Sequence, residues 1–284
     1  MNVRTPATSI VAALDEPWRF LRRDFGKWAP PAFGIAALGM VPSLVMQWFS
    51  GGLAAASANP DAFDFVALGG FYAGACGALV AYVVGQLAAF VIAARVLDGE
   101  RPGLGGALLG GISPRLVVIG GGAMLVTLFG FACIVAGPIL GGVFLFAPVI
   151  VVTRGGWASA LTEGVNVATQ RASPSDAGLP MWKLAAITTI WYGVYLSGNQ
   201  LASLPTLVWT LWHVVSNLGQ GDFLTAMQFQ APFPVGAATA VVGALLRPFA
   251  DIYLAAGAII LWRDIQRVRA GADLEALVSE GVRA

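Results

Sequence analysis

The sequence is poor in charge, and this shortage excludes most soluble functions. Only 11% of its 284 residues are charged, whereas soluble globular domains carry about 25%. Hydrophobic residues make up 57% of the chain, and the mean hydropathy is +0.77. Lipid must therefore surround most of the chain. The net charge of +1 gives no bias toward an acidic partner, so no nucleic-acid partner is predicted.

Histidine and cysteine are also scarce. The only histidine, His213, excludes a two-histidine metalloprotease helix, and it lies among tryptophans, as an interfacial anchor would. Cys76 and Cys133 both fall in apolar runs without a second ligand at metal-binding spacing. They are predicted to be small packing residues. No metal, cofactor or catalytic residue is expected, and the chain is not predicted to be an enzyme.

Long apolar runs are what the chain has instead. Each is long enough, or nearly so, to cross a hydrocarbon core of about 30 Å at about 1.5 Å per residue. The predicted fold is all-α: a polytopic integral membrane protein of six transmembrane helices in three hairpins, with amphipathic cytoplasmic helices. The six spans are 29–49, 65–94, 116–135, 138–152, 184–213 and 234–262, with a cytoplasmic leader at 1–28, a membrane domain at 29–262 and a tail at 263–284. The third and fourth are short and share a predicted turn at Gly137 and Pro138, which fits a hairpin or a re-entrant loop.

The leader carries a helical pattern. Apolar residues from Ile10 to Phe25 recur at helical spacing opposite acidic residues and arginines, which predicts an amphipathic helix, kinked or interrupted near Pro17, in the headgroup layer. A solvated leader with chance periodicity is the alternative. Residues 56–58 resemble a signal-peptide cleavage site, but the apolar run before them is longer than a usual signal core, which favours an uncleaved first span.

The basic residues indicate one orientation. Lysines and arginines fall before span one and after spans two, four and six, while the other connections contain none. Basic connections stay on the cytoplasmic side, so an even number of spans and two cytoplasmic termini are predicted.

An arginine closely follows each of the second, fourth and sixth predicted spans. These are Arg95, Arg154 and Arg263, and a glycine and an Ala-Leu pair follow each one at similar spacing. Segment 157–170 after Arg154 is predicted to be amphipathic, with Trp157 and Leu161 on its apolar face and the inner membrane surface beneath it. The pattern indicates a weak internal threefold repeat, as transporters can have.

Small residues four apart should let helices approach closely. The pairs are Gly70 and Gly74, Ala73 and Gly77, and Gly137 and Gly141.

Three stretches resemble a known family. They are the leader at 12–26, GPILGGVFLFAPVIVV at 137–152 with GGWASALTEGV after it, and AIILWRDIQRVRAG at 258–271. Together they resemble a broad bacterial group of six-span proteins that includes the membrane domain of glycerophosphoryl diester phosphodiesterases. The resemblance implies a six-helix membrane domain with cytoplasmic termini. In the phosphodiesterases catalysis belongs to a separate soluble barrel domain, so no catalytic residue is carried over.

A few polar residues lie inside the predicted spans. Arg247 and Asp251 are four residues apart on one face of span six, and such charges usually face protein or water. Asn199 and Gln200 reach a similar depth in span five, and Gln86 lies near the middle of span two. These five residues could line an outward-open polar cavity that binds an anion. Alternatively, Arg247 and Asp251 form an internal ion pair that, with the amides, holds helices together.

Two functions follow from these patterns. The first is a non-enzymatic structural or accessory component of a membrane assembly in the bacterial inner membrane. The alternative is a small permease or lipid-handling protein that uses the residues around Arg247 and Asp251. Membrane lipids are expected partners in both cases, with a membrane protein or a second copy of the chain as a further partner.

Overall fold

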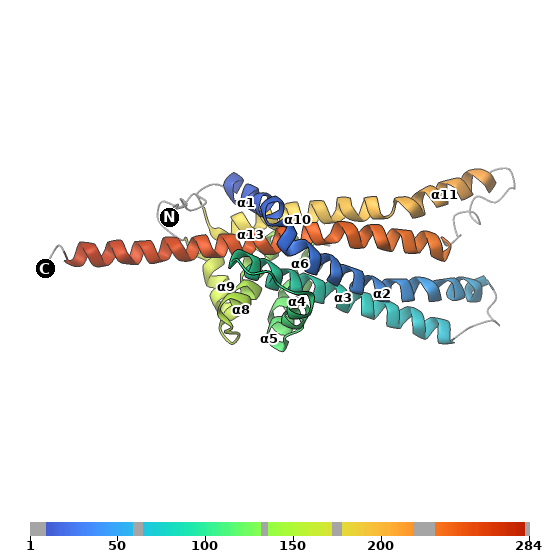
Figure 1. Cartoon of the computed structure of the whole chain (residues 1–284), viewed down its shortest axis with the longest axis horizontal. Helices are drawn as coiled ribbons and strands as arrows, with labels where there is room; N and C mark the ends of the chain where they lie inside the picture. The colour runs from blue at the N-terminus through green and yellow to red at the C-terminus, as the bar shows by residue number, and fades with distance from the viewer. Residues whose placement is uncertain (1–9, 59–64, 132–135, 172–177, 218–230, 282–284) are drawn as a thin grey trace. The chain divides into compact units, whose positions relative to one another are not determined.

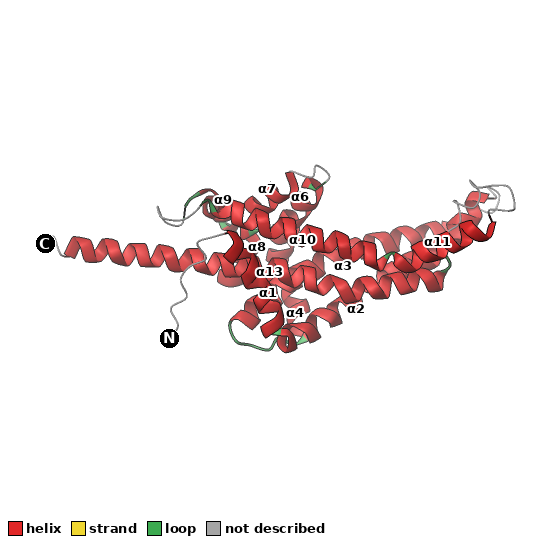
Figure 2. Ribbon diagram, turned by 90° about the horizontal axis from the view of Figure 1, so that it is seen from above, coloured by secondary structure: helices red, strands yellow, loops and turns green. Residues whose placement is uncertain are grey.

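The described residues of the chain form helices and no strands (Figures 1 and 2). The computed structural model describes residues 10–58, 65–131, 136–171, 178–217 and 231–281, without the side chains of 51–58 and 272–281. The elements are α1 (Ile10–Arg23), α2 (Phe25–Ala58), α3 (Phe65–Leu97), α4 (Leu104–Gly111), α5 (Pro114–Leu116), the π-helix η2 (Val117–Gly121), α6 (Gly122–Gly130), α7 (Ala136–Phe144), α8 (Phe146–Arg154), α9 (Ala160–Thr169), α10 (Pro180–Ala202), α11 (Leu204–Asn217) and α13 (Phe233–Gly281). The predicted all-α class is confirmed for these residues.

Four helical segments in the described part of the chain are long and apolar enough to cross a membrane. They are Phe25–Ser50, Phe65–Leu97, Ala136–Arg154 and Phe233–Gly271. A fifth candidate combines Leu104–Gly111 with Pro114–Gly130, which meet at a bend of 52°. Predicted spans one, two, four and six match the four candidates, and span three matches the second part of the bent pair.

Predicted span 184–213 is divided between two helices and is not among the candidates. α10 ends at Ala202, Ser203 forms a turn, and α11 begins at Leu204. Pro205 has no backbone N–H, and its ring clashes with the carbonyl four residues earlier, so a helix cannot continue through it undistorted.

The chain divides into two compact units, and four long helices contribute residues to both. Unit 1 contains Met1–Ala32, Gln86–Gly193 and Phe249–Ala284. Unit 2 contains Phe33–Gly85 and Val194–Pro248. Each unit is described by itself below.

The core of unit 1 is built on α3 and α13. Their largest fully buried side chains include Leu87, Phe90 and Tyr253. Two side-chain contacts in this unit show how the helices pair: Gln86 binds Asp251, and Asp98, just after α3, binds Arg263, with the partners 165 residues apart in both cases. Since both residue numbers rise together, α3 and α13 run parallel.

Helix α1 packs its apolar face on α13. The rings of Trp18 and Tyr253 lie 4.8 Å apart, and the Tyr253 hydroxyl donates to the Leu14 carbonyl at 3.4 Å. A Cβ atom at Gly257 would lie 3.1 Å from Pro17 Cγ, so the missing side chain makes room for the proline. The helix continues through Pro17, and the predicted interruption there is wrong. Protein therefore covers part of the face that we expected in the headgroup layer.

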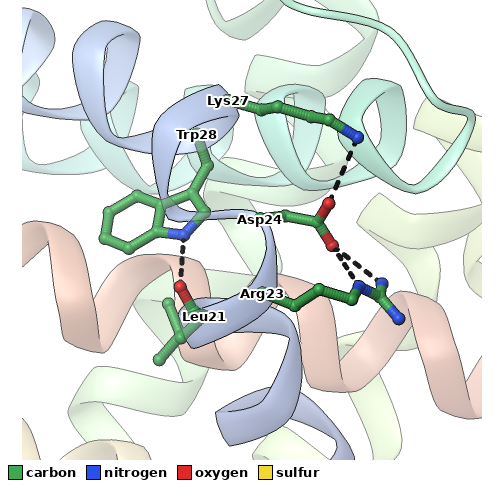
Figure 3. Close-up of polar contacts among 5 residues, drawn as sticks. All are labelled: Leu21, Arg23, Asp24, Lys27 and Trp28. Atoms are coloured by element: carbon green, nitrogen blue, oxygen red, sulfur yellow. Dashed lines mark hydrogen bonds and ion pairs between the residues drawn. The ribbon is translucent and has the colours of Figure 1, made fainter.

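The junction of α1 and α2 is held by Asp24 and Trp28 (Figure 3). The Asp24 carboxylate binds Arg23 at 2.7 Å and Lys27 at 3.2 Å, while Trp28 Nε1 donates to the Leu21 carbonyl at 3.0 Å. Burial alone would raise the pKa of Asp24, but the hydrogen bonds and charges of Arg23 and Lys27 outweigh burial and lower it. The carboxylate stays ionised and joins the last turn of α1 to the first turn of α2.

The turn predicted at Gly137 and Pro138 is wrong, because both residues are helical. Both lie in the first turn of α7, where a proline costs no intrahelical hydrogen bond. Most of the connection from α6 to α7, residues 132–135, lies outside the described residues and contains Cys133. The predicted close approach at Gly137 and Gly141 is confirmed, because Cβ atoms there would overlap Phe131 and Thr188.

Helix α9 packs on the protein through a face of mainly small residues. Ala160, Gly164 and Val167 are buried, and a Cβ at Gly164 would lie 3.0 Å from the Ala147 nitrogen of α8. Trp157 and Leu161, predicted on an apolar face above the inner membrane surface, are exposed, and their contact with the membrane stays a prediction. These small residues are buried because they let α9 lie directly against the α8 backbone.

The third repeated segment differs from the other two. Loops separate α4 from α3 and α9 from α8, whereas α13 continues without a break past Arg263 to Gly281. The segment after Arg263 is therefore a continuation of α13 rather than a helix of its own.

Unit 2 packs through small residues and exposes large apolar ones. Cβ atoms at Gly70 and Gly74 of α3 would overlap Phe49 and Met46 of α2, and one at Gly77 would lie 3.0 Å from Pro42. The predicted close approach at these glycines is confirmed. Cys76 is exposed, so its prediction as a buried packing residue is wrong.

Candidate functional site

Gln86 and Asp251 form a buried polar pair in unit 1. Gln86 on α3 has no exposed surface, and Asp251 on α13 is 5% exposed. The Gln86 amide nitrogen donates to Asp251 Oδ1. Within the described residues Gln86 Oε1 is buried without a hydrogen-bond partner, which is an uncommon and costly arrangement. The pair therefore joins two parallel apolar helices through a buried side-chain hydrogen bond.

Arg247 has its own contact in unit 2. Its Nη2 donates to the Tyr82 carbonyl at 2.6 Å, and its guanidinium carbon lies 4.2 Å from the centre of the Tyr82 ring. A Cβ at Gly85 would lie 3.1 Å from Arg247 Nη2, so the glycine leaves space for the guanidinium. The tyrosine satisfies the arginine with both its backbone oxygen and its ring face.

Asn199 and Gln200 lie near the end of α10, and both side chains are exposed. Ser203 contacts their backbone, since its amide donates to the Asn199 carbonyl and its hydroxyl to the Gln200 carbonyl. Of the five predicted residues, the structure brings Gln86 and Asp251 together, and it places Arg247 against Tyr82. The shared cavity of all five, and the ion pair between Arg247 and Asp251, stay predictions.

Tyr82 is the residue that sequence reasoning missed. Tyr82 precedes Gln86 by four residues, as Arg247 precedes Asp251. The common spacing puts Tyr82 and Gln86 on one face of α3 and was a usable signal. The equal spacing predicts these two contacts only once α3 and α13 are known to run parallel, because parallel helices then bring both pairs together.

A second group of contacts lies where α3, α8 and the apolar part of α13 end. Arg154 at the end of α8 ion-pairs with Glu163 of α9, donates to Gln266 Oε1 at 2.8 Å, and lies 5.0 Å from the Trp262 ring centre. Arg263 of α13 donates to Asp98 Oδ1 at 2.7 Å and to the Ala94 carbonyl at 3.5 Å. We call Arg154 and Arg263, with these contacts, the arginine clamps.

The two arginine clamps follow the predicted repeat. Arg154 reaches the residue before Arg263 and the residue three after it, which are Trp262 and Gln266. Arg263 reaches the residue before Arg95 and the residue three after it, which are Ala94 and Asp98. Equivalent arginines therefore make equivalent contacts to the next repeat, which gives the sequence repeat a structural counterpart.

Little else in the described part of the chain has the chemistry of a reaction centre. His213 stacks on Trp209 with ring centres 5.1 Å apart and planes at 8°. The described residues contain no group of three or more histidine, cysteine or acidic side chains that could hold a metal ion. No family model matches the sequence, and searches of curated proteins and of solved structures also find no match.

Proposed function

We propose that the protein is a non-enzymatic component of a membrane assembly, embedded in the bilayer as a structural or accessory subunit. One observation carries the proposal: the polar side chains of the apolar helices are used between helices. Gln86 binds Asp251, and Arg247 binds the carbonyl and ring of Tyr82. Intramembrane polar groups engaged in this way hold helices together.

We further propose six crossings with both termini in the cytoplasm. The arginine clamps support this count, because they bring the ends of α3, α8 and the apolar part of α13 together. If these ends meet at one membrane surface, all three helices cross in the same direction. An odd number of crossings must then separate each from the next. The bent pair α4 to α6 supplies one, and α10 with α11 supplies the other.

The membrane concerned is the bacterial inner membrane in this proposal. The family resemblance of segments 12–26, 137–152 and 258–271 supports that location, and the distribution of basic residues supports the cytoplasmic termini.

A small permease is the second candidate. The buried Gln86 Oε1 favours it, since an acceptor without a partner among the described residues can bind a solute or a water molecule. In this case Asp251 and Gln86 would contact what passes through the protein, and Arg247 would hold an anionic group.

Purification from the native membrane tests the first proposal. The protein is extracted in nanodiscs, and co-purifying proteins and lipids are identified by mass spectrometry. A stoichiometric protein partner supports a structural or accessory subunit. A protein that purifies alone, with an anionic solute that is lost in Arg247→Ala, contradicts it and favours the permease.

Alanine variants separate the two candidates further. A structural role predicts that Asp251→Ala lowers the thermal stability of the purified protein or the yield of its partner. A permease role predicts normal stability and partner yield with loss of solute retention. Gln200→Ala is the matched control, because Gln200 is an exposed amide outside both contacts.

A further inference from the structure

Arg95 is the one member of the arginine repeat without a clamp. Arg154 and Arg263, its equivalents, each make polar contacts with the next repeat. In the described part of the chain the Arg95 side chain makes no hydrogen bond or ion pair. Continuing the pattern would require Arg95 to reach Thr153 and Trp157 of the second repeat, and no such contact exists among the described residues.

The Arg95 guanidinium lies on the backbone of α4. A Cβ atom at Gly106 would lie 2.9 Å from Arg95 Nη1, so a side chain there would displace the guanidinium. Arg95 is partly buried, which restricts its side chain and removes part of its hydration. A partly desolvated guanidinium without an acceptor is costly unless an anion completes its hydrogen bonds.

The position of Arg95 suits a phosphate. The candidate span Phe65–Leu97 ends two residues beyond it, so Arg95 lies at the end of the apolar segment, where a membrane-spanning helix meets the lipid headgroups. Of the two nearby carboxylates, Asp98 is bound by Arg263, while Glu100 is exposed beside the exposed Arg101. The local charge is therefore not dominated by acidic groups.

We propose that Arg95 binds a phosphate group, which a lipid headgroup presents at this depth and which free phosphate can also supply. The guanidinium forms two parallel hydrogen bonds to phosphate oxygens, a geometry that lysine cannot match. The bound phosphate takes the place of the missing third clamp. The inference does not rest on the proposed function, because a structural subunit and a permease can both hold a lipid.

The test is a thermal-shift titration of the whole purified chain in neutral detergent. The probes are dihexanoyl phosphatidylglycerol, inorganic phosphate and, as a phosphate-free control, dihexanoylglycerol. We expect phosphatidylglycerol to raise the unfolding midpoint, and Arg95→Gln to weaken its apparent affinity about fivefold, the effect of one arginine at a membrane surface. Arg101→Gln, the exposed control, should bind as the wild type does.

A pair of glycine variants tests the same site with the arginine in place. Gly106→Ala should displace Arg95 and weaken binding, whereas Gly105→Ala should not, since a Cβ there meets nothing within 4 Å. This pair decides the question if Arg95→Gln does not fold. Binding of phosphatidylglycerol alone identifies a lipid headgroup, and binding of both phosphate compounds identifies a general phosphate site.

Three results would overturn the proposal. The first is that neither phosphate compound binds. The second is that dihexanoylglycerol binds as well as phosphatidylglycerol. The third is that the Arg95 and Arg101 variants, or the Gly106 and Gly105 variants, lose binding to the same extent.

Discussion

The two parts of α3 have similar composition and opposite surroundings. In unit 2, residues 65–85 bury only Ala67 and Gly74, whereas in unit 1 all of residues 86–97 except Arg95 and Leu97 are buried. Both parts are mostly apolar, and Gln86 and Arg95 are the amide and charged residues among them. In lipid there is no hydrophobic force to separate a protein-facing side chain from a lipid-facing one, so hydropathy alone does not distinguish them. What differs is how much of each part the rest of the chain covers.

The largest effect is expected from truncating a buried leucine of α3, in comparison with an exposed leucine of the same helix. Leu87 has no exposed surface, and Leu79, eight residues earlier, is 55% exposed. Leu87→Ala should lower the free energy of unfolding by about 2 to 5 kcal/mol, because it leaves a cavity. Leu79→Ala should cost less than about 1 kcal/mol. Unfolding in detergent, followed by circular dichroism, measures both, and equal losses would mean that the two parts are packed alike.

A smaller effect is expected from the buried amide. Gln86→Leu removes the donor to Asp251 while keeping the side-chain volume close to the original, and it should cost about 1 to 3 kcal/mol. The same unfolding measurement on Gln200→Leu is the control and should show little change. A stable Gln86→Leu variant would show that the hydrogen bond does not hold α3 to α13.

In unit 2 the polar contact of α13, between Arg247 and Tyr82, should contribute less to the free energy of unfolding than the contact of Gln86 with Asp251. Arg247→Lys keeps the charge but loses the flat guanidinium over the Tyr82 ring, so a cost of about 1 kcal/mol is expected. A double-mutant cycle with Tyr82→Leu isolates the ring contact, since the carbonyl acceptor remains. Additive effects of the two substitutions would show that the ring contributes nothing.

The smallest effect concerns the α1–α2 junction and depends on pH. The pKa of Asp24 is lowered in the folded state, so its contribution is present above the ordinary value of 3.8 and is lost as pH falls through the folded value. Asp24→Asn should therefore be less stable than the wild type at pH 7, by about 1 kcal/mol or less, and the difference should shrink as pH falls below 3.8 and vanish once the folded-state carboxyl is protonated. Unfolding midpoints across this range measure it, and a difference independent of pH would contradict the ionised role.

Periodicity was enough to predict the helices but not their partners. The spacing from Ile10 to Phe25 predicted α1, yet its burial against Tyr253 depends on a helix more than 200 residues away. Arg247 and Asp251 were found because charge is costly in lipid. Their observed partners Tyr82 and Gln86 are set by helix pairing, which local spacing does not determine.

Breaks between helices were predicted less accurately than the helices themselves. A glycine followed by a proline resembles a turn, but Gly137 and Pro138 open α7, because the first turn of a helix tolerates both. Proline was the signal missed at Pro205, where α10 gives way to α11. The equivalence of Arg95, Arg154 and Arg263 was visible in the sequence, but only the contacts of two of them reveal that the third differs.

The unbroken course of α13 has a mechanical consequence. The helix has 49 residues, so at about 1.5 Å per residue it is more than twice as long as a hydrocarbon core is thick. No proline or loop lies between Asp251 and Arg267. A twist of α13 about its axis at Asp251 would therefore turn Arg263 and Arg267 through the same angle. Over this stretch the continuous helical backbone directly links the buried Asp251 to the arginines beyond the apolar segment.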